Sequence, residues 1–221
     1  MQYNKAILDT QQFKHGYTQN FNDVYHFPQI FDDMMIEDIH RMVYENDVPF
    51  QKGQTGNHEE SDNHYSNNRD IAYLHPEKYC EPLYNFLESI TLKANQELFH
   101  IDVNVVSDPL HYVIYPEPQS DETTGVYREE GGYLDWHMDI GQGGVNHRKL
   151  ATIVQLSDPK DYEGGELKFF FGGRWPENII TMDLKKGDAC VFPAFYMHGV
   201  TPITKGKRYS IITWMEGDTF R

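Results

Sequence analysis

The residues whose types and spacing best suit chemistry are the triplet His137-Met138-Asp139 and a second histidine, His198, 61 positions further along. Residues two apart in a strand point to the same face of a sheet, so His137 and Asp139 are placed to bind one ion. An H-x-D triplet alone is common by chance, and the competing interpretation is a set of satisfied polar side chains on a sheet surface. With His198 the set becomes two imidazoles and one carboxylate, which suits a divalent transition metal.

Two histidines and one carboxylate form the facial triad that holds Fe(II) in non-haem iron oxygenases and leaves positions open for other ligands. An α-keto acid and O₂ could occupy those positions, and the far carboxylate of the keto acid would then need a cation. Arg208, ten positions after His198, suits this role because a guanidinium binds a carboxylate through two parallel hydrogen bonds. Lys205 and Lys207 are poorer candidates, since they lie in or beside a glycine turn. Strand alternation would place three more side chains on the wall that Arg208 faces: Ser210, Ile212 and Trp214.

From Tyr133 to Trp214 the chain resembles the 2-oxoglutarate/Fe(II) dioxygenases of the prolyl 4-hydroxylase type and the bacterial hydroxylases called PKHD-type. The matching pieces follow the family's order: His137-x-Asp139, Leu156-Ser157-Asp158-Pro159, Tyr162-Glu163-Gly164-Gly165-Glu166-Leu167, Lys186-Gly187-Asp188, His198-Gly199-Val200-x-Pro202 and Lys205-Gly206-x-Arg208-Tyr209. The first hundred residues show only a general likeness to the helical support of these enzymes.

The resemblance implies a double-stranded β-helix, or jelly roll, with Fe(II) held near one mouth of the barrel. It implies that His137, Asp139 and His198 are the iron ligands and that Arg208 binds the distal carboxylate of 2-oxoglutarate. Tyr115 resembles a tyrosine that lines the same pocket in some members. No catalytic residue beyond these metal and cosubstrate residues is implied.

Three positions depart from the family pattern. Leu134 stands where many members have a tyrosine three residues before the first ligand, and Tyr133 is offset by one. Gln155 replaces a tyrosine that often helps to bind 2-oxoglutarate, and Ile212 replaces a hydroxyl-bearing residue of some members. These departures leave the iron ligands unchanged but alter the residues expected around the cosubstrate.

Short β segments separated by turn residues should position these side chains. The candidate strands are Val103–Tyr115, Tyr133–Met138, Lys149–Leu156, Glu166–Phe171, Ile179–Asp183, Ala189–Phe192, His198–Pro202 and Arg208–Met215. Apolar residues recur at helical spacing over Asp33–Asn46 and Glu77–Phe99, and Pro82 favours a later start for the second helix.

These elements predict a mainly β fold with supporting helices (α+β), a jelly roll whose N-terminal helices pack on one sheet. No repeat or linker divides the chain, so we expect a single domain over 1–221. Residues 1–102 would supply the helical support and a polar loop, and residues 103–221 the jelly-roll core.

Two polar segments and several further histidines have no assigned role. Gln51–Asp70 is predicted to be a long polar loop, in which His58 and His64 match no ligand spacing. The acidic segment Pro116–Gly132 is interpreted either as a solvated hairpin tip or as a lid over the substrate. The remaining candidates, His111 and His147, are interpreted as structural or surface residues.

Composition excludes several other classes. The 221 residues carry 19 basic and 34 acidic side chains, a net charge of −15, which disfavours nucleic acid as a partner. No apolar run is long enough to span a membrane, and the first residues do not resemble a signal peptide, so we expect a cytoplasmic protein without a membrane partner. Two cysteines, Cys80 and Cys190, cannot form a disulfide framework.

The sequence therefore predicts a 2-oxoglutarate-dependent Fe(II) dioxygenase that hydroxylates a C–H bond and releases succinate and CO₂, with O₂ as cosubstrate and ascorbate as a candidate reductant. By resemblance, the first predicted substrate is a prolyl residue in a peptide or protein. The alternative is a free amino acid or another small molecule. A cupin-like metal-binding or sensing protein without turnover is the rival from a different class, and it would have no need of a buried carboxylate clamp such as Arg208.

Overall fold

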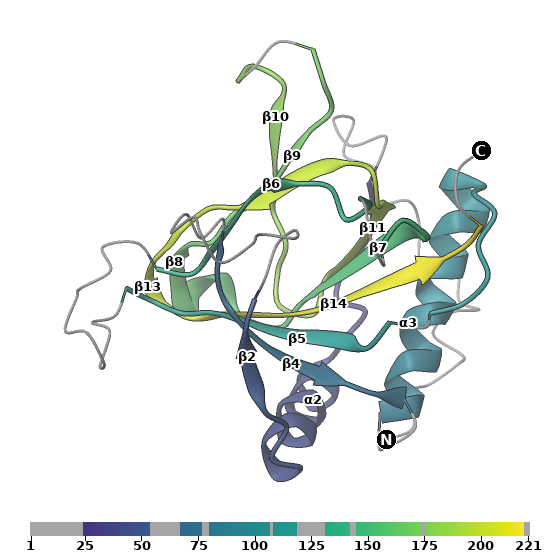
Figure 1. Cartoon of the computed structure of the whole chain (residues 1–221). Coiled ribbons are helices and arrows are strands. Elements are labelled where there is room, and N and C mark those ends of the chain that lie inside the picture. The colour runs from purple at the N-terminus through teal and green to yellow at the C-terminus, as the bar shows by residue number, and fades with distance from the viewer. Residues whose placement is uncertain are drawn as a thin grey trace, which may run out of the picture.

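The computed structural model describes residues 24–53, 67–76, 80–106, 108–118, 131–141, 145–173 and 176–218. They form two antiparallel sheets that pack face to face around an apolar core, with helices α2 and α3 on the outer face of the larger sheet (Figure 1). The predicted mainly β fold with helices packed on one sheet is confirmed. Among the described residues no helix is long and apolar enough to span a membrane.

The larger sheet contains the strands that carry most of the core. Its order is β1 (Tyr25–Phe27), β11 (Ala189–Pro193), β7 (Arg148–Gln155), β14 (Arg208–Glu216), β5 (Leu110–Tyr115), β4 (Asp70–Leu74) and β2 (Phe50–Lys52). The smaller sheet runs β10 (Ile179–Met182), β9 (Leu167–Phe170), β12 (Met197–Val200), β6 (Tyr133–His137) and β3 (Asn67–Asn68). Strands β13 (Ile203–Gly206) and β8 (Tyr162–Gly164) pair to form a separate two-stranded ribbon. A short 3₁₀ turn, η3 (Pro159–Asp161), precedes β8.

Helix α2 (Asp33–Glu45) begins where the Asp32 side chain accepts a hydrogen bond of 2.8 Å from the backbone N–H of Met35. Such an N-cap satisfies one of the free donors at a helix start. Its apolar stripe, which includes Ile36 and Ile39, is buried against the larger sheet. The predicted helix over Asp33–Asn46 is confirmed to within one residue.

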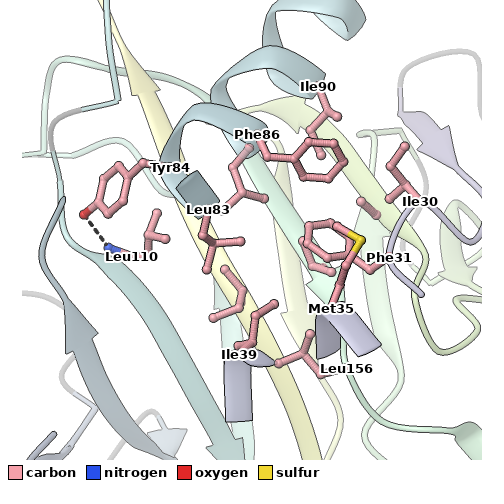
Figure 2. Close-up of a cluster of buried hydrophobic side chains, with 14 of the residues drawn as sticks. Ile30, Phe31, Met35, Ile39, Leu83, Tyr84, Phe86, Ile90, Leu110 and Leu156 are labelled. Carbon is pink, nitrogen blue, oxygen red and sulfur yellow. Dashed lines mark hydrogen bonds between the residues drawn. The ribbon is translucent and has the colours of Figure 1, made fainter. Parts of the chain in front are cut away.

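Helix α3 (Glu81–Ala94) starts four residues later than the predicted Glu77, because Pro82 fits only the first turn of a helix. A π-helical turn, η2 (Asn95–Phe99), extends it. Figure 2 shows Leu83, Phe86 and Ile90 of α3 packed against the α2 side chains and the sheet. The Tyr84 hydroxyl also accepts a hydrogen bond of 3.0 Å from the backbone N–H of Leu110 on β5, which ties α3 to the sheet (Figure 2).

Alternation along β14 separates the two faces of the larger sheet. Ile211 and Met215 face the helices, whereas Arg208, Ile212 and Trp214 face the smaller sheet and line a cavity there. Strand β5 repeats the pattern, with Tyr112 on the helix side and Tyr115 on the cavity side. Arg208 thus faces inward, as its expected role of binding a carboxylate requires.

The predicted polar loop over Gln51–Asp70 is wrong at both ends. Gln51 and Lys52 belong to β2, residues 67–68 form β3, and Asp70 opens β4. Residues 54–66 lie outside the described part of the chain, as do residues 119–130 of the predicted acidic lid. Strand β5 also begins at Leu110, and not at the predicted Val103.

Six strands were absent from the sequence prediction: β1, β2, β3, β4, β8 and β13. Five of them span only two to four residues, which is too short to show a period. Strand β4 is longer, but its consecutive Ile71 and Ala72 are both fully buried, so polar and apolar residues do not alternate.

Asp188, in the Lys186-Gly187-Asp188 turn, binds the segment that contains His26 and Gln29. Its side chain is 2% exposed and accepts hydrogen bonds from His26 Nε2 at 2.9 Å and from the backbone N–H groups of Gln29 and Lys185 at 2.8 and 2.9 Å. We expect Asp188→Ala to lower the free energy of unfolding by about 2–4 kcal/mol, because a nearly buried carboxylate and all its hydrogen bonds are lost. Urea denaturation measures this difference.

The same carboxylate predicts a dependence on pH. Burial would raise the pKa of Asp188, but the hydrogen bonds from His26 and the two backbone amides hold the pKa below its usual value. Because its pKa is lower in the folded state, the ionised Asp188 carboxylate stabilises the fold at any pH above its unfolded-state pKa near 4. This stabilisation is lost as the pH falls through the folded-state pKa. The stability difference between the wild type and Asp188→Asn should therefore shrink in acid. A difference that stays constant from pH 7 to pH 3 would contradict this account.

Candidate metal centre

His137, Asp139 and His198 meet at one end of the smaller sheet. His137 ends β6, and His198 lies directly opposite it on β12. Asp139 follows β6, where its backbone N–H donates a hydrogen bond of 2.9 Å to the carbonyl oxygen of Ala194. His137 Nε2 lies 3.5 Å from Asp139 Oδ1, and His198 Nε2 lies 3.6 Å from Asp139 Oδ2. The three side chains predicted to bind one ion are thus brought together.

Both imidazoles are held in the orientation that a metal requires. His137 Nδ1 donates to the carbonyl oxygen of Asp135 at 2.8 Å, and His198 Nδ1 donates to that of Tyr196 at 2.9 Å. These bonds place the proton on Nδ1 and leave each Nε2 lone pair free, as in metal sites where a carbonyl fixes the ligand tautomer. His198 is further fixed by the Phe192 ring, whose centroid lies 4.8 Å from its own.

The protonation states also suit a metal. Burial alone would raise the pKa of Asp139, but the neighbouring His198 and His137 outweigh it and hold the pKa below its usual value. Burial lowers the pKa of His198 to about 4, although Asp139 opposes this shift. At neutral pH the cluster therefore holds an ionised carboxylate and an unprotonated His198.

The donor set of the cluster fits Fe(II). Asp139 Oδ2 is buried, and no side chain or backbone group in the described part of the chain donates a hydrogen bond to it. Two imidazole nitrogens and one carboxylate oxygen are the protein ligands of non-haem Fe(II) sites with open positions. A metal ion would give the orphaned oxygen its partner.

A second group of metal-ligating types, Asp108, His147 and Glu216, also lies within 4.8 Å in the described residues. Asp108 is already paired with a residue outside the group, and the other two members contact each other. Arg148 Nη2 contacts Asp108 Oδ2 at 2.6 Å, and His147 Nε2 contacts Glu216 Oε1 at 3.0 Å. This group is therefore explained as an ion-pair cluster at the ends of the central strands β7 and β14.

A cavity of about 260 Å³ opens beside the His137, Asp139 and His198 cluster. Its wall includes Tyr115 and Arg208, as predicted, together with the predicted strand neighbours of Arg208: Ser210, Ile212 and Trp214. His111 also lines it, with the Trp214 and Tyr73 rings each 4.7 Å away between centroids. His111, interpreted from the sequence as a structural or surface residue, therefore also forms part of the cavity wall.

Arg208 is 2% exposed and is held by Gln155, a residue to which the sequence analysis gave no role. Its Nε donates to Gln155 Oε1 at 3.0 Å, while Gln155 Nε2 donates to the Tyr162 hydroxyl at 3.0 Å. The Tyr115 ring lies directly across the strand pair, its centroid 5.2 Å from the guanidinium carbon. Arg208 Nη1 is buried and has no hydrogen-bond partner among the described residues. A buried, partly unsatisfied guanidinium in a cavity is a site for a carboxylate.

Gly165, in the Gly164-Gly165-Glu166 motif, leaves room for Arg208. Its φ of +63° is a conformation that glycine adopts without strain. A Cβ atom there would lie 2.3 Å from Ile203 Cδ1 and 3.3 Å from Arg208 Cδ. The close approach of Ile203 and Arg208 is therefore a second reason for glycine at this position, beside its positive φ.

Two further arginines line the cavity, and sequence reasoning assigned neither. Arg148 opens β7, where it pairs with Asp108 and stacks on Trp214 with its guanidinium carbon 3.6 Å from the ring centroid. Arg69 lies between β3 and β4. It is the sole arginine between Arg41 and Arg128, which is the one signal in the sequence that sets it apart.

Comparisons with known proteins agree with this geometry. The model of the 2OG-Fe(II) oxygenase superfamily matches residues 99–216, just over half of the chain. A PKHD-type hydroxylase of Colwellia psychrerythraea is 38% identical over 90 residues, which are 39% of this chain and 38% of that protein. A PKHD-type hydroxylase of a Synechococcus strain is 35% identical over 86 residues, 39% of this chain and 37% of that protein. The chain thus spans about two fifths of the length of these curated relatives.

Solved structures resemble the whole described fold. A prolyl-4-hydroxylase of Pseudomonas putida superposes with a TM-score of 0.62 at 15% identity, covering 96% of this chain and 98% of that one. A prolyl hydroxylase of Trichoplax adhaerens, in complex with a hypoxia-inducible-factor peptide fragment, gives a TM-score of 0.64 at 16% identity, covering 89% and 84%. At such identities the likeness establishes the shared jelly-roll fold alone.

Proposed function

The chain belongs to the 2OG-Fe(II) oxygenase superfamily, and from this premise we propose that it is a 2-oxoglutarate-dependent hydroxylase acting on a C–H bond. The overall reaction would convert substrate, O₂ and 2-oxoglutarate into hydroxylated substrate, succinate and CO₂. Ascorbate remains a predicted reductant.

One observation carries this proposal: a three-ligand cluster and a buried, partly unsatisfied guanidinium line the same cavity. A metal-binding or sensing protein without turnover would need the cluster alone. The guanidinium of Arg208 adds a site for a carboxylate at a distance from the cluster, as a keto acid with a second carboxylate requires.

Each residue then has a stated task. His137, Asp139 and His198 hold Fe(II), which when bound activates O₂ for oxidation of an unactivated C–H bond. Arg208 binds the distal carboxylate of 2-oxoglutarate, and Gln155 fixes the plane of its guanidinium through the Nε hydrogen bond. The apolar walls, including Ile212 and Leu167, exclude water from the reacting groups.

A prolyl residue in a peptide or protein is the first candidate for the substrate. Support comes from the names of similar proteins: PKHD-type hydroxylases among the relatives, and a structural neighbour that binds a peptide fragment. A free amino acid or other small acid is the second candidate, and the guanidinium of Arg69 in the same cavity favours it.

The test of the proposed function is succinate formation. Purified protein with Fe(II), O₂ and 2-oxoglutarate should form succinate slowly alone and faster with one member of a panel of proline-containing peptides and free amino acids. Removal of O₂ or Fe(II) should abolish the product. Wild-type protein that binds iron but neither binds nor consumes 2-oxoglutarate would instead establish the metal-binding alternative.

A further inference from the structure

Arg69 lies at a crossing point between the two sheets. The preceding residue, Asn68, pairs with Tyr133 on β6 of the smaller sheet, and the following residue, Asp70, pairs with Ile114 on β5 of the larger sheet. The carbonyl oxygen of Arg69 accepts a hydrogen bond of 2.8 Å from the backbone N–H of Gly53. The backbone is thus fixed on both sides, and the Arg69 side chain lines the cavity beside the metal cluster.

The three arginines of the cavity differ in their partners. Arg148 is neutralised by Asp108 and covered by Trp214, and Arg208 is held by Gln155. Arg69 is 8% exposed, its Nε is buried without a hydrogen-bond partner, and no acidic side chain in the described ranges pairs with it. A guanidinium that is partly buried with no anion beside it is costly, so a ligand that supplies the anion is expected to bind there.

The cavity is electropositive within an acidic protein. The whole chain carries −15, yet Asp139 is the sole carboxylate among the described residues that line the cavity. Of the three arginines there, Arg148 is paired with Asp108, which leaves the charges of Arg69 and Arg208. His111 adds no charge, because burial, together with the charges of Arg148 and Arg69, lowers its pKa to about 3. Low-dielectric walls of one charge sign concentrate ligands of the opposite sign.

The proposed function assigns roles to two charged side chains of the cavity and none to Arg69. Asp139 is assigned to the metal and Arg208 to 2-oxoglutarate. Arg69 lines the same cavity as His137, Asp139 and His198. A carboxylate that it binds would therefore lie in the cavity where a C–H bond would be oxidised.

We infer that Arg69 binds a carboxylate of the substrate, and that the substrate is a free amino acid or a similar small acid. The inference rests on the proposed function and selects the small acid over an internal prolyl residue, which has no carboxylate to offer. The cavity volume of about 260 Å³ agrees with a small substrate, since it lies just below the usual range of ligand pockets and the cavity must also hold 2-oxoglutarate.

The test compares matched probes. The free proteinogenic amino acids, their carboxamides, and an N-acetylated, C-amidated peptide with an internal proline are each added to wild-type protein with Fe(II), O₂ and 2-oxoglutarate. At least one free acid should stimulate succinate formation. A concentration of its carboxamide at least about tenfold higher should be needed for the same stimulation, which corresponds to the lower end of the free energy of a hydrogen bond to a charged group. Equal stimulation by acid and carboxamide, or stimulation by the internal-proline peptide alone, would overturn the inference.

The variants Arg69→Gln and Arg69→Lys locate the effect. Anaerobic titration of the stimulating acid into the Fe(II) and 2-oxoglutarate complex should show a Kd raised about 10- to 150-fold in Arg69→Gln and partly restored in Arg69→Lys. The affinity for 2-oxoglutarate itself should stay at the wild-type value in both. Arg41→Gln, at an arginine that is 56% exposed on α2, is the matched control and should change neither affinity.

The outcomes separate the two proposals. Slow succinate formation that no free acid stimulates would overturn the role of Arg69 while leaving the proposed function in place. The same holds for an unchanged Kd of the acid in Arg69→Gln. Absence of both 2-oxoglutarate binding and succinate formation in the wild type would overturn the proposed function and this inference with it.

Discussion

Replacing His198 with alanine is expected to abolish Fe(II) binding at micromolar protein concentration. The cluster offers two imidazoles and one carboxylate, so the variant loses one of the three proposed protein ligands. Loss of a hydrogen-bonded neighbour of a ligand typically costs about 10- to 100-fold in metal affinity, and loss of the ligand itself should exceed this. Anaerobic titration of Fe(II), followed by calorimetry, measures the difference without any need for turnover.

The control must separate a lost ligand from a damaged fold. His198 is buried against Phe169 and Phe192, so alanine also leaves a cavity, whereas His198→Gln keeps most of the volume and should still bind Fe(II) weakly. Thermal unfolding of both variants reports the packing loss separately. His147→Ala is the matched control, because His147 belongs to the other group of metal-ligating types and should leave Fe(II) affinity unchanged. Loss of the ion in His147→Ala with retention in His198→Ala would move the metal to that second group.

The ligand cluster could be predicted from the sequence because its geometry is mostly local. His137 and Asp139 lie two residues apart at the end of β6, and the two-residue period of any strand shows which side chains share the face of Arg208. The pairing of β12 with β6, which places His198 opposite His137, needed the family resemblance as well. The long strands β7 and β14 were predicted to within one residue at each end, because each is a run of eight or nine residues rich in β-branched and apolar side chains.

The rest of the cavity could not be predicted, because it depends on short strands and distant contacts. Arg69 is positioned by the two strands that flank it. Strand β3 spans only two residues, and β4 contains consecutive buried residues that do not alternate with polar ones. Gln155 was recognised as a departure from the family pattern, but its hydrogen bond to Arg208 joins residues 53 positions apart. Single-sequence patterns report periods along the chain, whereas these contacts depend on which strands become neighbours.

Replacing Arg208 with alanine is expected to weaken 2-oxoglutarate binding strongly while leaving Fe(II) binding nearly intact. The guanidinium is buried, and its Nη1 has no hydrogen-bond partner in the described part of the protein, so the incoming carboxylate would complete it. Losing one partner of a buried charged pair typically costs about 2–5 kcal/mol, or about 30- to several-thousand-fold in affinity. Anaerobic titration of 2-oxoglutarate into the Fe(II) protein measures the loss.

Two further variants decide how Arg208 acts. Arg208→Lys should be milder than alanine, because the charge remains while the planar pair of donors is lost. Gln155→Leu should also weaken 2-oxoglutarate binding, by less than Arg208→Ala, because the guanidinium keeps its charge but loses the hydrogen bond that fixes its plane. Lys205→Ala is the matched control, since Lys205 is 73% exposed and contacts Glu163. If Arg208→Ala bound 2-oxoglutarate as tightly as the wild type while Lys205→Ala did not, the carboxylate would bind at the glycine turn, and the buried guanidinium would need another anion.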